Sequence, residues 1–109
     1  MLDLRPKDLI LVHELIARYL PPPVAVWAYG SRVNGNAYDG SDLDLVLRGP
    51  DLAALPAGLL SHFREALTDS NLPIFVDAHD WARLPESFHS RILNCYEVVR
   101  PGAAVAVPA

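Results

Sequence analysis

The sequence predicts a single small α/β domain in which helices cover a small β-sheet. Apolar residues recur at helical spacing in three segments, and segments rich in β-branched and aromatic residues lie between them. The resulting order is helix, strand, strand, helix, strand, helix. The chain has 109 residues, enough for one modest core, and its 51% hydrophobic and 20% charged residues are typical of a globular protein.

The first half of the chain predicts one helix and two strands. Over residues 6–20 apolar side chains recur every three or four positions, and Pro6 suits a first helical turn. Three consecutive prolines then end the helix, and residues 24–29 (VAVWAY) have the composition of a strand. A polar segment with spaced glycines, residues 32–41, leads to a second strand over residues 42–47.

The second half predicts a helix, a strand and a last helix. Residues 55–67 carry an apolar residue at every fourth position, residues 74–79 (IFVDAH) have the composition of a strand, and Pro85 opens the last helix. The apolar face of this last helix is expected to contain Phe88, Ile92, Tyr96 and Val99. We assign residues 1–100 to the domain and residues 101–109 to a C-terminal tail without usable periodicity.

Composition excludes several classes of function. The net charge of -4 and the pI near 5.4 argue against a protein that binds nucleic acid through bulk positive charge. The single cysteine, Cys95, allows no internal disulfide and no multi-cysteine zinc site, and we expect it to be a small buried residue. No signal peptide and no apolar run long enough to span a bilayer is recognised. We therefore expect a cytoplasmic protein that contacts neither membrane nor nucleic acid directly.

Three aspartates are the candidate catalytic residues. Asp42 and Asp44 alternate with leucines, so the leucines can face the helices while both carboxylates share the other face of the sheet. Like charges so placed repel each other and need a cation, and Mg²⁺ prefers such oxygen ligands. Asp77, preceded by apolar residues in the third predicted strand, supplies a third carboxylate. Asp80 is the alternative if that strand is misregistered.

A glycine-serine pair, Gly30 and Ser31, ends the first predicted strand, and ten residues separate Ser31 from Asp42. The glycine lets backbone N–H groups approach phosphate oxygens closely, and the serine hydroxyl adds a donor. The loop has neither the lysine of a Walker A sequence nor a GxGxxG spacing. Magnesium would therefore have to carry most of the countercharge for a bound triphosphate.

The order Gly30-Ser31, ten residues, Asp42-x-Asp44, with a later strand aspartate, resembles the signature of DNA polymerase β-type nucleotidyltransferases. The short chain and the segments GSRVNGNAYDGSDLDLVL and VDAHDWARLPESFHSRIL resemble minimal nucleotidyltransferase (MNT) domain proteins. The resemblance extends from about residue 6 to residue 99 and implies a polymerase β-like fold.

The resemblance also implies an activity, ligands and a partner. It implies a transferase that moves AMP from ATP to an acceptor, with two Mg²⁺ ions held by Asp42 and Asp44 and the nucleophile-side ion also by Asp77. Gly30 and Ser31 would bind the triphosphate. Arg32, next in the loop, is a further candidate nucleotide ligand, although an exposed loop arginine is often simply solvated. Many MNT proteins of this size are antitoxins encoded beside a HEPN-domain partner, and some adenylylate a tyrosine of that partner, which silences its RNase activity.

Other interpretations of the same residues stay open. The aspartates could form a solvated strand end. The chain could be a non-catalytic antitoxin that neutralises a HEPN-type RNase by binding, with the acidic cluster as a docking surface. It could also transfer a nucleotide to a small molecule, but 109 residues leave no room for an acceptor pocket unless a partner subunit supplies it.

Overall fold

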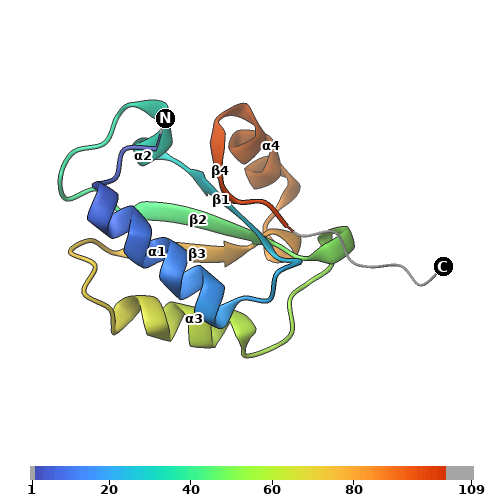
Figure 1. Cartoon of the computed structure of the whole chain (residues 1–109). Coiled ribbons are helices and arrows are strands. Elements are labelled where there is room, and N and C mark those ends of the chain that lie inside the picture. The colour runs from blue at the N-terminus through green and yellow to red at the C-terminus, as the bar shows by residue number, and fades with distance from the viewer. Residues whose placement is uncertain (1, 103–109) are drawn as a thin grey trace.

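The computed structural model describes residues 2–102, and Figure 1 shows the arrangement of their helices and strands. The elements in chain order are α1 (Pro6–Tyr19), β1 (Ala25–Tyr29), α2 (Ser31–Asn34), β2 (Leu43–Arg48), the 3₁₀ turn η1 (Pro50–Leu52), α3 (Leu59–Thr68), β3 (Val76–Asp80), the 3₁₀ turn η2 (Trp81–Arg83), α4 (Glu86–Asn94) and β4 (Tyr96–Arg100).

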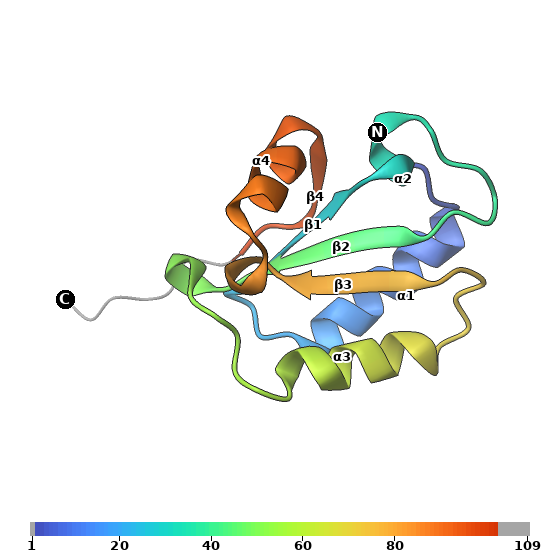
Figure 2. The same cartoon turned by 180° about the vertical axis from the view of Figure 1, so that it is seen from behind.

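The strands form one mixed sheet in the order β3-β2-β1-β4. β1 is antiparallel to both β2 and β4, whereas β2 and β3 are parallel. A parallel pair needs a crossover, and α3 provides it. Seen from the two opposite sides, α1 lies against one face of the sheet, and α4 lies beside β1 and β4 (Figures 1 and 2).

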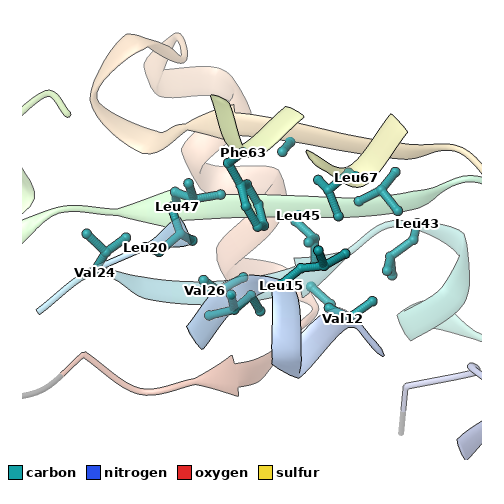
Figure 3. Close-up of a cluster of buried hydrophobic side chains, with 14 of the residues drawn as sticks. Val12, Leu15, Leu20, Val24, Val26, Leu43, Leu45, Leu47, Phe63 and Leu67 are labelled. Carbon is teal, nitrogen blue, oxygen red and sulfur yellow. The ribbon is translucent and has the colours of Figure 1, made fainter. Parts of the chain in front are cut away.

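The main core confirms the alternation predicted for the second strand. Leu43, Leu45 and Leu47 are fully buried against α1 and α3, where they pack with residues such as Phe63 and Leu67 (Figure 3). On the opposite face of the sheet, a smaller cluster joins Val46 to residues from β1, η2 and α4. Its buried members are Tyr29, Val46, Trp81 and Ile92. Asp44 lies on this second face because side chains alternate along a strand.

The end of the last helix differs from the sequence prediction. α4 stops at Asn94, Cys95 is already extended, and Tyr96 belongs to β4. Apolar residues at positions 88, 92, 96 and 99 fit helical spacing, but residues 96–100 instead pair with the edge of β1. The edge of β1 needs hydrogen-bond partners, and adjacent valines favour the extended conformation. Cys95 is exposed at this junction, so the expectation that it is buried is wrong.

None of the helices within residues 2–102 is long and apolar enough to cross a membrane. Residues 101 and 102 of the predicted tail are exposed, and residues 103–109 lie outside the described part of the chain.

Candidate functional site

Asp44 and Asp77 occupy directly paired positions on the neighbouring parallel strands β2 and β3. Their side chains point to the same face of the sheet, at an inter-strand distance of about 4.8 Å. Burial raises the pKa of the Asp44 carboxyl, the charges of Asp77 and Asp42 raise it further, and His79 opposes them. Asp42 is exposed just before β2. The structure thus brings the three predicted carboxylates into one electrostatic cluster.

Asp80, the alternative to Asp77, has a structural environment of its own. It is 2% exposed and on the other face of β3 from Asp77. Its Oδ2 accepts a hydrogen bond from the Leu55 N–H at 2.9 Å, and its Oδ1 accepts one from the Ala82 N–H at 3.1 Å. Asp80 therefore holds the chain segments that flank β2 and β3. Asp77 instead pairs with His79, Oδ2 to Nε2 at 3.0 Å, on the face that carries Asp44.

Gly30 separates β1 from α2 and lies against the Asp44 side chain. Its φ of +79° is one that side-chain-bearing residues rarely adopt, and a Cβ at this position would collide with the Asp44 carboxylate. Its carbonyl oxygen accepts hydrogen bonds from the N–H groups of Val33 and Asn34, both at 3.0 Å. Ser31 begins the short helix at once. The turn therefore places the predicted phosphate loop beside the predicted carboxylates.

A cavity of about 400 Å³ opens over these groups, between the sheet and α4. Among the described residues 2–102, no lysine or arginine other than Arg91 lines this cavity. Burial raises the pKa of the Tyr29 phenol, Asp44 and Asp77 raise it further, and Arg91 lowers it, so all four groups share one electrostatic environment. The cavity is lined by Tyr29, Gly30, Asn34, Asp44, Asp77, Phe88, Arg91, Ile92, Asn94 and Cys95.

The residues of α4 that line this cavity were not assigned to the site from sequence. In the sequence, Phe88 and Arg91 are spaced by about one helical turn. This spacing indicates that the two side chains share a helix face and could line one site. The Arg91 guanidinium lies 5.4 Å from the centre of the Phe88 ring. Within residues 2–102, no carboxylate forms an ion pair with Arg91. The cavity therefore contains one cation that is available to an anionic ligand.

Arg32 is not an exposed loop residue, because it is only 6% exposed. Its Nε donates to the Ser41 carbonyl at 2.9 Å, its Nη1 to the Asp3 carbonyl at 2.9 Å, and its Nη2 to the Asp39 carbonyl at 3.0 Å. These carbonyls belong to the N-terminal segment and to the loop before β2. The side chain thus holds the loop that leads to Asp42, and it does not line the cavity beside Asp44.

The carboxylates have the right chemistry for a hard divalent cation, but they do not form a preassembled site. No three His, Cys, Asp or Glu side chains within residues 2–102 are grouped closely enough to hold a metal ion as they stand. Two adjacent carboxylates with a third nearby are nevertheless the oxygen donors that Mg²⁺ prefers. Burial, followed by the charges of Asp77 and Asp42, raises the pKa of Asp44, and a bound cation would favour its ionised form.

Comparison with known proteins assigns the chain to a family. No protein-family model matches it. The probable protein adenylyltransferase MntA of Haemophilus influenzae is 39% identical over 101 residues, which cover 91% of this chain and 84% of that protein. The chain belongs to the MntA family of protein adenylyltransferases. Membership in the MntA family confirms the resemblance to nucleotidyltransferases that the sequence indicated.

Two solved structures share the fold with this MntA family member. A crystal structure of a toxin-antitoxin with AMP-PNP has a TM-score of 0.69 and 16% identity, over 89% of this chain and 74% of that chain. A crystal structure of a toxin-antitoxin MntA-HpeT mutant has a TM-score of 0.69 and 14% identity, over 85% of this chain and 73% of that chain. These similarities confirm the predicted α/β fold class.

Proposed function

We propose that this chain transfers AMP from ATP to a tyrosine hydroxyl of a HEPN-domain toxin and thereby acts as its antitoxin. The observation that carries this proposal is the register pairing of Asp44 with Asp77 next to the Gly30 turn. Membership in the MntA family supports the reaction class. The relatives that form toxin-antitoxin complexes, one of them with an ATP analogue, support a toxin partner and ATP as the nucleotide.

Asp42, Asp44 and Asp77 would hold Mg²⁺, because Asp44 and Asp77 line the cavity and the charge of Asp42 acts on Asp44. Bound Mg²⁺ ions would offset the charge of the triphosphate and lower the pKa of the attacking hydroxyl. Gly30 lets the backbone of the loop lie directly against the Asp44 carboxylate, where a side chain would collide, and both residues line the cavity. Ser31 contributes its hydroxyl and its backbone N–H at the start of α2.

The reaction would be an in-line displacement at the α-phosphorus of ATP. The tyrosine oxygen forms a new bond to this phosphorus, the bond to the bridging oxygen breaks, pyrophosphate leaves, and the hydroxyl proton passes to solvent. The chain supplies positioning and charge and forms no covalent bond with the nucleotide. The cavity opens to the surface of the protein, so a protein side chain can enter it.

The test is to co-express this chain with the protein encoded beside it and to measure the intact mass of that partner. We expect an increment of one or more AMP units with wild type and none with Asp44→Asn. Asp69→Asn is the matched control, because Asp69 is an exposed carboxylate at the end of α3. It should leave the increment unchanged.

Two outcomes would overturn the proposal. An unmodified partner that still binds tightly and loses its toxicity would favour neutralisation by occlusion. A mass increment that persists in Asp44→Asn would place the chemistry elsewhere. Removal of divalent cations with a chelator should also abolish the increment if Mg²⁺ acts at the aspartates.

A further inference from the structure

The outer strand β4 presents an aromatic surface on the same face of the sheet as Asp44. Tyr96 and Val98 are 41% and 46% exposed, although both are large and apolar. They pair with Tyr29 and Trp27 of β1, so their side chains share the face that carries the cavity. We call Trp27, Arg48, Tyr96 and Val98 the edge patch.

Stacking joins the two aromatic rings and the guanidinium of the edge patch. The Trp27 and Tyr96 rings are parallel to within 11°, with centroids 4.1 Å apart. The Arg48 guanidinium lies 3.9 Å from the Trp27 ring centroid and 4.5 Å from that of Trp81. Groups that are already ordered lose little further conformational entropy when a partner covers them. Tryptophan, tyrosine and arginine are also the residues that most often dominate protein-protein binding energy.

The edge patch adjoins the catalytic cavity directly. Asn94 and Cys95 line the cavity, and Tyr96 is the next residue along the chain. β4 also ends the sheet, so its outer edge has no strand partner within residues 2–102. The other strongly exposed apolar residues are scattered over different elements, such as Ile10 on α1 and Leu52 on η1. A protein whose tyrosine enters the cavity would therefore also lie close to β4.

We infer that the edge patch is the docking surface for the protein acceptor, and that it presents the acceptor tyrosine to Asp44 and Asp77. This inference rests on the proposed function for the identity of the occupant. It adds the surface that the occupant contacts and the direction from which its tyrosine enters. The predicted contact is an apolar surface of the partner laid across Tyr96 and Val98.

The first test measures partner affinity with Val98→Lys and with the matched control Ile10→Lys. Lysine is well tolerated on exposed strand edges, so Val98→Lys should fold. We expect it to weaken binding of the co-expressed partner at least about tenfold, while Kd for ATP and the thermal midpoint stay unchanged. Ile10→Lys, at an exposed apolar site on α1 (59%, against 46% for Val98), should bind the partner normally. Normal binding by Val98→Lys would overturn the inference.

The second test uses Cys95, which is exposed and is the chain's single cysteine. We expect the bound partner to slow alkylation of Cys95 strongly. In a Cys95→Ser, Ile10→Cys variant, the partner should leave alkylation of the new cysteine unchanged. Equal alkylation of Cys95 with and without partner would overturn the inference. Self-association of the lone chain that Val98→Lys abolishes would assign the edge patch to a second copy instead.

Failure of this inference is distinguishable from failure of the proposed function. If Val98→Lys transferred AMP with an unaltered KM for the partner, the proposed enzymatic function would stand and the docking inference would be rejected. If partner binding depended on Val98 but the partner showed no mass increment, the docking inference would stand and the proposed adenylylation would be rejected.

Discussion

Asp44 and Asp77 stand side by side across β2 and β3, with Gly30 packed against the Asp44 carboxylate. Two like charges in register destabilise a sheet unless another group offsets them. His79 beside Asp77 supplies only part of that compensation. The site thus keeps a repulsive pair at the edge of its core, as binding sites for cations do.

Asp44→Asn should make the fold more stable at neutral pH. The folded-state pKa of Asp44 lies above its unfolded value, so the ionised carboxylate costs stability above that folded pKa. We expect a gain of about 0.5 kcal/mol at pH 7, a modest value because Asp44 is partly exposed to solvent. The gain should disappear as the pH falls below the unfolded pKa. Urea unfolding across this pH range measures it, and a less stable variant at pH 7 would contradict repulsion.

Gly30→Ala should impair both folding and ATP binding. Gly58→Ala is the matched control, because Gly30 and Gly58 have φ of +79° and +91° but a Cβ at Gly58 meets no atom within 4 Å. We expect Gly58→Ala to cost about 1 kcal/mol from backbone strain and to bind ATP normally. Gly30→Ala should cost about 2 kcal/mol and weaken ATP binding about tenfold. Denaturation measures the stability of both variants, and calorimetric titration measures their ATP binding. If Gly30→Ala and Gly58→Ala had equal effects in both measurements, close packing of Gly30 on Asp44 would be contradicted.

Arg32→Ala should destabilise the protein by about 3 kcal/mol, because a buried guanidinium that donates to several carbonyls would be lost. Arg18→Ala, on the exposed side of α1, should change stability by less than about 0.5 kcal/mol. Chemical denaturation measures both variants. If Arg32→Ala kept wild-type stability and lost ATP binding, Arg32 would be a nucleotide ligand after all.

Arg91→Gln should raise the KM for ATP about tenfold with little change in kcat, since a charged hydrogen bond to phosphate is worth about 1.5–3 kcal/mol. The reason is that Arg91 lines the cavity and has no carboxylate partner within residues 2–102. Steady-state kinetics with varied ATP test this prediction, with Arg18→Gln as the control. A change in kcat alone would instead indicate that Arg91 stabilises the transition state and does not contribute to ATP binding.

Much of the fold could be predicted, because the alternation of apolar and polar residues in strands and the spacing of apolar residues in helices indicate which side chains are buried. The alternation of leucine and aspartate over residues 42–47 is enough to separate the core face of β2 from its carboxylate face. The same reasoning failed after Asn94, where apolar residues at helical spacing pair as a strand instead. The local spacing of apolar residues contains no information on strand pairing. It therefore cannot show that the edge of β1 needs a hydrogen-bonded partner from a distant part of the chain.

The sequence by itself determined the residue types of the site, the spacing of Gly30, Asp42 and Asp44, and the face on which the carboxylates lie. Only the tertiary structure decided that Asp77 rather than Asp80 stands beside Asp44, because strand register is a contact between distant segments. It also decided that Arg32 supports a loop and that Arg91 lines the cavity. Side-chain direction on folded elements depends on packing, which a one-dimensional pattern does not contain.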